Sequence, residues 1–252
     1  MNKSFDLFDW KRYVTINSDL KEISNKEDAW NHWLTIGEKE NRVPCFGISS
    51  DYPTINILTR TGTRTTYYKT LKDSIHNQTY KNIRHIKSND NPECTFLSDE
   101  VDVVSVEKKK EKGSGFYNLY LNDLGNRVDN GWIIVLDDDS RLIDNTFIES
   151  LAKICAKSRE KDVLIYQTRL AKRRIVPKDE LFKAKSIVKY RIDMSCFCVH
   201  HTVFKKFPFN AERMGDFRFL NSIKCTKQYC FRFVTLPIGI WANYDGEKYG
   251  EN

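Results

Sequence analysis

The chain has 252 residues and a formal net charge of +7, with 40% hydrophobic and 13% aromatic residues. This length accommodates one substantial domain and a small appendage, and the composition is that of a folded globular protein. No apolar run approaches the ~18 residues that a membrane-spanning helix requires, so we expect no membrane span.

Basic residues gather in two segments, 106–113 and 169–178. Neither segment is interleaved with the aromatic side chains on which a single-strand binder stacks bases, so we expect no nucleic-acid partner. The first segment is predicted to be a solvated loop. The second fits either an anionic substrate or a solvated face.

The cysteines and the first residues point to an intracellular protein. Seven cysteines are an odd number, the chain contains no CxxC, and Cys196 and Cys198 are spaced as same-face residues of a strand. We expect buried free thiols. The opening residues, MNKSFDLFDWKRY, mix acids and aromatics where a secretory signal would have an uninterrupted apolar core. A cytoplasmic location is therefore expected.

Residues 1–44 are predicted to form a small helical module. Ser24 and Glu27 fit a capping box, and Gly37 is placed to end the helix in a left-handed cap. We expect its aromatic residues to pack on the main domain, and an interaction or acceptor-binding role, including a contact in a homodimer, is the alternative. One apolar face would be formed by Trp30, Trp33 and Leu34.

Residues 52–252 are predicted to form one α/β domain with a doubly wound, mostly parallel sheet. The run WIIVL is continuously apolar, as in a strand that is buried on both faces. Strands are expected at 54–59, 82–87, 101–106, 132–136 and 162–167, and helices at 66–78, 115–128 and 146–158.

Polar residues follow three of these strands. The loop RTGTR (60–64) follows the first strand, Asp90 follows the second, and Asp137–Asp139 follow the fourth. Each alone also fits an ordinary turn. In doubly wound sheets, however, ligands bind outside the carboxyl ends of the strands, so one shared site is the better interpretation.

The three consecutive aspartates need a compensating charge, because carboxylates this close repel one another when ionised. If the chain stays extended there, Asp137 and Asp139 project to the same side. Carboxylate oxygens suit Mg²⁺ or Mn²⁺, which shares a few protein ligands with substrate phosphates. We therefore predict a divalent ion together with a diphosphate substrate, and a solvated turn is the alternative.

The span INILTRTGTRTTYYKTLKDSIHNQTYKNIRHIKSND, followed by WIIVLDDDSRLID, resembles the nucleotide-sugar-binding half of family 2 glycosyltransferases with the GT-A fold. The resemblance covers about residues 54–144. It implies metal-dependent transfer of a sugar, usually with inversion, from a nucleoside-diphosphate sugar to a glycan or protein hydroxyl. A UDP-sugar donor and Mn²⁺ or Mg²⁺ are the expected cofactors.

Site residues follow from the same resemblance. Thr59, Arg60 and Thr61 would lie beside the nucleobase or ribose, and Asp90 would hydrogen-bond the base. Asp137 would approach the ribose, and Asp138 is assigned to the donor site as well. Asp139, together with Asp137, would bind the divalent ion.

The carboxy-terminal half, 145–252, is expected to bind the acceptor. Its segment MSCFCVHHTVFKKFPFNAERMGDFRFLNSI resembles the strand, short helix and acidic turn of the family, in which an acid activates the acceptor hydroxyl. Asp216 is the candidate general base and Glu212 the reserve, while capping of a helix near Phe217 is the alternative role for Asp216. Trp241 and Tyr244 fit sugar stacking or ordinary packing, and Arg169 and Lys172 are candidates to reach the diphosphate.

The segments YVTINSDLKEI and AWNHWLTIGEKENR are similar to a short module that precedes sugar-transferase domains in some large DNA viruses and bacteria. This resemblance implies a viral or bacterial source, and in a virus it implies glycosylation in the host cytoplasm or viral factory. Two other functions stay open. One is a sugar-phosphate nucleotidyltransferase, and the other is a non-catalytic carbohydrate- or nucleic-acid-binding protein on a transferase-like scaffold.

Overall fold

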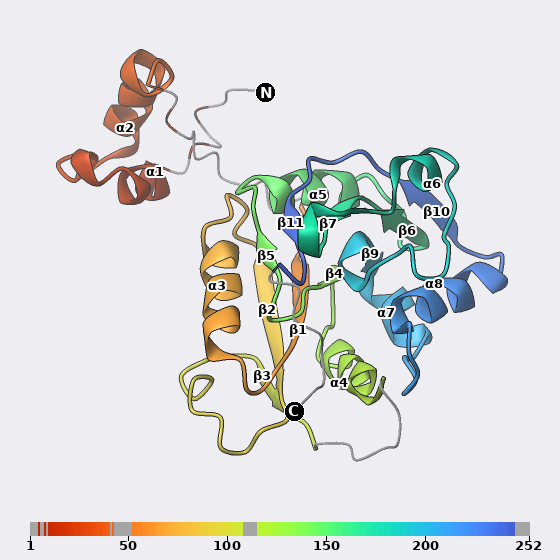
Figure 1. Cartoon of the computed structure of the whole chain (residues 1–252). Coiled ribbons are helices and arrows are strands. Elements are labelled where there is room, and N and C mark those ends of the chain that lie inside the picture. The colour runs from red at the N-terminus through yellow and green to blue at the C-terminus, as the bar shows by residue number, and fades with distance from the viewer. Residues whose placement is uncertain are drawn as a thin grey trace. The chain divides into compact units, whose positions relative to one another are not determined.

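The computed structural model describes Phe5, Phe8, residues 10–40, Arg42, and residues 52–107 and 115–244. The chain divides into two compact units, Met1–Tyr52 and Pro53–Asn252, and each has its own set of internal contacts (Figure 1). Residues 45–51, between the two predicted domains, and most of the basic segment 106–113 lie outside the described residues.

The amino-terminal unit is built around aromatic side chains that pack against one another. The indole of Trp33 is 3% exposed, and the Tyr13 hydroxyl lies 3.0 Å from Nδ1 of His32. These aromatic residues form the core of the unit itself, and their packing on the main domain stays a prediction. Its elements are α1 (Trp10–Ile16), a 3-10 turn (Ser18–Leu20), α2 (Lys26–His32) and a π-helical turn (Trp33–Gly37).

Three details of this unit differ from the sequence prediction. The cap of α2 is Asn25, whose side chain accepts a 2.9 Å hydrogen bond from the Asp28 amide, one residue beyond the predicted Ser24. Gly37 does not have a left-handed conformation. Gly37 instead packs closely against Tyr13. A Cβ at position 37 would lie 2.2 Å from the Tyr13 hydroxyl oxygen, so a larger residue would clash there. Leu34 is 40% exposed and lies outside the core.

The second unit is organised by a seven-stranded sheet, which confirms the predicted α/β fold with a mostly parallel sheet. All neighbouring strands are parallel except β9, which runs antiparallel to both of its neighbours. In spatial order the strands are β10 (Cys230–Phe233), β6 (Asp162–Ile165), β9 (Phe197–His200), β4 (Trp132–Val135), β1 (Ile55–Thr61), β2 (Ile83–Asn89) and β3 (Val103–Ser105).

Helices cover the sheet as the periodicity predicts. Tyr68, Leu71 and Ile75, the predicted apolar positions of the first helix, are buried. Helices α3 and α4 lie on opposite sides of β1 and β2 (Figure 1). The helices are α3 (Thr65–His76), α4 (Tyr120–Gly125, after a 3-10 turn at Phe116–Leu119), α5 (Phe147–Cys155), α6 (Asp179–Lys183), α7 (His201–Lys206) and α8 (Gly215–Cys225).

The motif SIHNQTY joins two helices that are distant in sequence. Gln78 is fully buried. Its amide nitrogen donates to the Asp144 carbonyl at 2.9 Å, and its amide oxygen accepts from the Ile148 amide at 3.1 Å. Since the first amides of a helix have no partner within it, Gln78 satisfies the start of α5.

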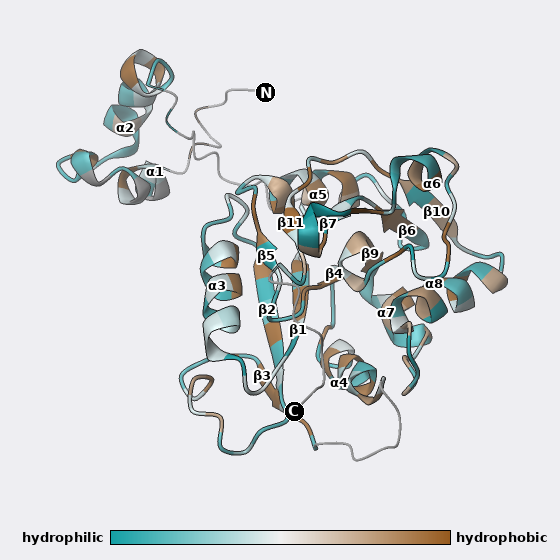
Figure 2. Ribbon diagram, viewed as in Figure 1, coloured by the Kyte–Doolittle hydropathy of each residue, from teal (hydrophilic) through white to brown (hydrophobic). Residues whose placement is uncertain are grey.

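The core lies in the central strands. All four residues of β4 and of β6 are buried, and the same strands are hydrophobic in Figure 2. Cys196 and Cys198 are buried free thiols, as predicted, although Cys196 belongs to a 3-10 turn (Met194–Cys196) and only Cys198 to β9. Within the described part of the chain, no helix has the length and apolarity to cross a bilayer.

A second, small sheet was not predicted. Its strand order is β5 (Arg141–Leu142), β11 (Ile240–Trp241), β7 (Thr168–Arg169) and β8 (Ile175–Val176). The first strand begins two residues after Asp139. The small sheet therefore continues directly from the three aspartates.

One edge of the large sheet collects polar residues. The carboxyl ends of β1, β2 and β4 meet there because these strands are parallel. Strand β9 is antiparallel to β4, so its amino end, preceded by Asp193, reaches the same edge. The edge thus receives side chains from both halves of the unit.

Candidate active site

The three aspartates form a turn at the end of β4. The Ser140 amide donates to the Asp137 carbonyl at 2.8 Å, which closes the turn. The chain is therefore not extended there, and the assignment of a divalent ion to Asp137 and Asp139 stays a prediction. Asp138 and Asp139 are 2% and 3% exposed, so their charges need partners inside the protein.

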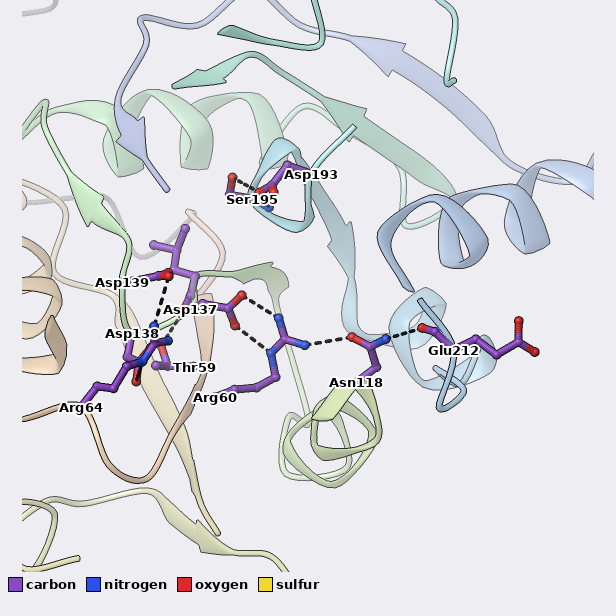
Figure 3. Close-up of polar contacts among 11 residues, drawn as sticks. Thr59, Arg60, Arg64, Asn118, Asp137, Asp138, Asp139, Asp193, Ser195 and Glu212 are labelled. Atoms are coloured by element: carbon purple, nitrogen blue, oxygen red, sulfur yellow. Dashed lines mark hydrogen bonds and ion pairs between the residues drawn. The ribbon is translucent and has the colours of Figure 1, made fainter. Parts of the chain in front are cut away.

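Arg60 is the partner of Asp137. The guanidinium binds both carboxylate oxygens, with Nε to Oδ1 at 2.7 Å and Nη2 to Oδ2 at 2.6 Å. It also donates to Oδ1 of Asn118 at 2.9 Å and lies 4.7 Å from the ring centre of Tyr117. The Asn118 amide in turn donates to the Glu212 carbonyl at 2.9 Å (Figure 3). One continuous hydrogen-bond chain therefore links β1 and the aspartates to the loop before α8.

Arg64 is the partner of the other two aspartates. Its guanidinium binds both oxygens of Asp138 and lies 3.3 Å from Oδ2 of Asp139 (Figure 3). Burial raises the pKa of Asp138 to about 6, although the charge of Arg64 opposes this rise. The compensating charge inferred from the sequence is thus supplied by two arginines of RTGTR. The sequence feature that could have identified these arginines is their position directly after β1, the strand next to β4.

Thr59, one of the predicted nucleotide-binding residues, has its hydrogen-bond partners within the large sheet. The buried Thr59 hydroxyl donates to the Leu136 carbonyl at 2.8 Å and contacts Nε2 of His85 at 2.8 Å. Thr61 is 7% exposed. Asp90 lies beside Gly62. A Cβ at position 62 would come within 2.1 Å of Oδ1 of Asp90, so only glycine leaves room for this carboxylate. The assignment of these residues to the nucleotide stays a prediction.

Two carboxyl groups from the second half of the unit face the same region. Asp193 accepts hydrogen bonds from the amide (2.9 Å) and hydroxyl (2.6 Å) of Ser195. Asp216 accepts from the Phe217 amide at 2.6 Å in the first turn of α8. Burial raises the pKa of Asp216 to about 7, and the charge of Asp193 adds to the rise while Arg60 opposes it.

The same charges act on Asp193. Burial raises its pKa, the charge of Asp137 raises it further, and Arg60 lowers it. Asp137, Arg60, Asp193 and Asp216 therefore form one electrostatic cluster. Asp193 was not among the residues predicted from the sequence. An Asp-x-Ser turn directly before an apolar run was the available signal, but only the antiparallel direction of β9 brings this turn to the site.

The reserve candidate, Glu212, is placed differently. Its carboxylate pairs with Arg218 at 2.5 Å and is half exposed. In Figure 3 it points away from Arg60 and the aspartates, whereas its backbone carbonyl faces Asn118. The structure thus brings Asp216, and not the Glu212 side chain, to the electrostatic cluster.

The carboxylates can be tested for their fit to a divalent ion. Among the described residues, no group of three or more His, Cys, Asp or Glu side chains is arranged to hold a metal alone. However, Asp138 and Asp139 gather around one cationic group, and their oxygens are the ligands that Mg²⁺ and Mn²⁺ prefer. The residues therefore fit an ion that takes part of its coordination from substrate phosphates.

Comparisons with known proteins concern the fold. No protein-family model and no curated protein matches the chain. Among solved structures, S. aureus TarS matches with a TM-score of 0.58 and 11% identity, covering 75% of this chain and 36% of that one.

Two further structures contain ligands. S. aureus TarS 1–349 in complex with UDP-GlcNAc matches with a TM-score of 0.56 and 10% identity, covering 79% of this chain and 60% of that one. The mannosyltransferase PcManGT from Pyrobaculum calidifontis, in complex with GDP-Man and Mn²⁺, matches with a TM-score of 0.56 and 12% identity, covering 79% and 59%. The chain thus spans between about a third and three-fifths of these structures. At such low identity the likeness shows the fold, and it confirms the predicted GT-A-type architecture.

Proposed function

We propose that this protein transfers a sugar from a nucleoside-diphosphate sugar to a hydroxyl group of a glycan or protein acceptor. The observation that carries the proposal is the cluster of Arg60, Asp137, Asp193 and Asp216 at the carboxyl edge of the sheet, directly beside the pair of Arg64 with Asp138 and Asp139. Ligands of doubly wound sheets bind at this edge. The fold neighbours that contain UDP-GlcNAc or GDP-Man support the choice of donor.

The donor half of the site is formed by β1 and the aspartate turn. Arg60 fixes the Asp137 carboxylate, and this fixed orientation suits a hydrogen bond to the donor ribose. Asp139 and Asp137 would hold Mn²⁺ or Mg²⁺, and a bound ion supplies Lewis-acid stabilisation to the leaving diphosphate. Arg64 provides a second positive charge at the same place, because its guanidinium already lies against Asp138 and Asp139.

Asp216 serves as the general base. An acid with a pKa of about 7 is partly ionised at neutral pH and still basic enough to accept a proton. The acceptor oxygen bonds to the anomeric carbon while the bond from that carbon to the diphosphate breaks. The diphosphate leaves with the electron pair, and the hydroxyl proton passes to Asp216. A single displacement of this kind inverts the anomeric centre.

The test combines binding with turnover. UDP and GDP are titrated with and without Mn²⁺ while the melting temperature is followed, and their sugar conjugates are then assayed for nucleotide release. A nucleotide at ~100 times its dissociation constant stabilises the native state by about 2.7 kcal/mol. We expect a metal-dependent shift that Asp139→Asn abolishes.

The matched control is Asp102→Asn, because Asp102 forms a comparable pair with Arg84 at the amino end of β2. This variant is expected to keep the nucleotide-dependent shift. Absence of both the shift and nucleotide release with every donor would overturn the proposed function.

A further inference from the structure

A second set of arginines lies on the small sheet, beside the three aspartates. Trp241 on β11 pairs in register with Arg141 on β5 and with Arg169 on β7. The guanidinium carbons of these arginines lie 4.6 and 5.5 Å from the Trp241 ring centre, and that of Arg141 lies 4.9 Å from the ring of Tyr244. We call these four residues the arginine ladder. Stacking on aromatic faces holds both guanidinium groups in place.

The arginine ladder carries positive charge that the described part of the chain does not compensate. Arg60, Arg64 and Arg84 each bind an aspartate, whereas no carboxylate of the described residues pairs with Arg141 or Arg169. In the same part of the chain, Nε of Arg141 and Nε1 of Trp241 are buried donors without a hydrogen-bond acceptor. A buried donor left unsatisfied costs about 1–3 kcal/mol, so an acceptor group from a ligand would relieve a real deficit.

The hairpin between β7 and β8 extends this positive surface. Lys172, Arg173 and Arg174 at its tip are exposed, and the tip is hydrophilic in Figure 2. Lys172 and Arg173 have φ values of 55° and 57°, a left-handed conformation that costs non-glycine residues roughly 1 kcal/mol or more each. None of the three forms an ion pair with a described residue. Two consecutive strained residues that are both cationic favour a surface that binds a ligand over a turn that only connects two strands.

The arginine ladder is connected to the candidate active site. The Tyr244 amide donates to the Asp139 carbonyl at 3.3 Å, and Arg141 follows Asp139 by two residues. A ligand bound along the ladder would therefore have one end beside the aspartates. We propose that the arginine ladder and the hairpin tip bind an acceptor that carries phosphate or carboxylate groups near its reacting hydroxyl. This inference rests on the proposed function and names the class of its acceptor.

The donor diphosphate offers the same chemistry, but the geometry favours the acceptor. Arg60 and Arg64 already supply cations to the aspartates from the end of β1, whereas the ladder belongs to the small sheet that begins with β5. Strand β11 separates β5 from β7, so the backbones of Arg141 and Arg169 are roughly 10 Å apart. With the hairpin tip, the surface carries five cations over a distance wider than one diphosphate. Bidentate contacts of arginine suit both phosphate and carboxylate.

The experiment uses the full chain and compares glucose 6-phosphate with glucose, which differ only in the anionic group. Binding is followed by calorimetry and by the Trp241 indole resonance, neither of which requires turnover. We expect glucose 6-phosphate to bind and shift this resonance, and glucose not to. Arg169→Gln should weaken the binding of glucose 6-phosphate by about tenfold or more and leave the affinity for UDP unchanged. Arg84→Gln is the matched control and should change neither affinity.

The double variant Arg173→Gln/Arg174→Gln is a second test that does not disturb the core, because both side chains are exposed. It should also weaken the binding of glucose 6-phosphate. Equal binding of glucose and glucose 6-phosphate, or no binding of either, would overturn the inference. A loss of UDP affinity in Arg169→Gln would assign the ladder to the donor instead. These readouts are separate from nucleotide release, so failure of the proposed function is seen independently.

Discussion

Arg60 and Asp137 are 77 positions apart in the sequence and form a two-bonded ion pair, with N–O distances of 2.7 and 2.6 Å. The pair connects the end of β1 with the turn after β4. Its side chains are 11% and 17% exposed, so solvent screens it only in part. It fixes the orientation of the first aspartate before any ligand binds.

Loss of this pair should reduce stability and donor affinity together. Arg60→Gln leaves the Asp137 carboxylate without its counter-ion, and we expect a loss of about 3 kcal/mol in the free energy of unfolding. Urea unfolding measures the loss. The double variant Arg60→Gln/Asp137→Asn should recover part of it, since no uncompensated charge remains. Purely additive losses would show that the two residues are not coupled.

Arg64 should compete with a divalent ion for Asp138 and Asp139. Arg64→Gln removes the resident cation, so Mn²⁺ alone should bind more tightly, by about tenfold if the competition is worth 1.4 kcal/mol. Mn²⁺ titration followed by electron paramagnetic resonance measures this affinity without nucleotide. Arg84→Gln, which breaks the pair with Asp102, should leave it unchanged. Equal Mn²⁺ affinities in Arg64→Gln and the native chain would contradict the competition.

Asp216 and Glu212 can be separated by kinetics. Asp216→Asn removes the proton acceptor and should lower kcat about 10²–10⁴-fold with little change in the KM for the donor. Glu212→Gln changes only exposed contacts with Arg218 and Asn210 and should keep most of the activity. Initial rates at saturating donor decide between them. The reverse ranking would assign the base to Glu212.

The activity should depend on pH through Asp216. Because the base must be ionised, kcat/KM is expected to rise with pH and to level off above the pKa of about 7. Asp193→Asn removes a negative charge that raises this pKa, so the inflection should move to lower pH. A pH profile of kcat/KM for both chains gives the shift. An inflection at the same pH in the variant would exclude Asp193 as a source of the raised pKa.

Stability should respond to the same carboxyl group in the opposite sense. The pKa of Asp216 is higher in the folded chain than its ordinary value of 3.8, so ionisation favours the unfolded chain as pH rises above 3.8. Asp216→Asn should therefore raise the melting temperature above pH 7 and have little effect below pH 3.8. Thermal unfolding at both pH values tests this. A melting temperature that Asp216→Asn lowers above pH 7 would show that the ionised carboxylate stabilises the fold.

Much of the fold follows from local pattern. The continuous apolar run at 132–136 predicted a strand buried on both faces, and the spacing of Tyr68, Leu71 and Ile75 predicted the buried face of α3. The position of Asp137–Asp139 after a central strand predicted the edge at which the polar side chains meet. These features depend on hydrophobic periodicity and on the geometry of parallel strands, which the sequence expresses within a few residues.

The partners of the aspartates were decided only by tertiary structure. Arg64 reaches Asp138 and Asp139 across 74 and 75 positions, and no local pattern encodes a contact of that separation. Asp193 joins the cluster because β9 runs antiparallel, and strand direction depends on the path of the whole chain. The arginine ladder rests on strands of two residues, too short to show any periodicity. Local sequence pattern therefore encodes the scaffold and the acidic edge, whereas long-range packing sets which charges compensate one another there.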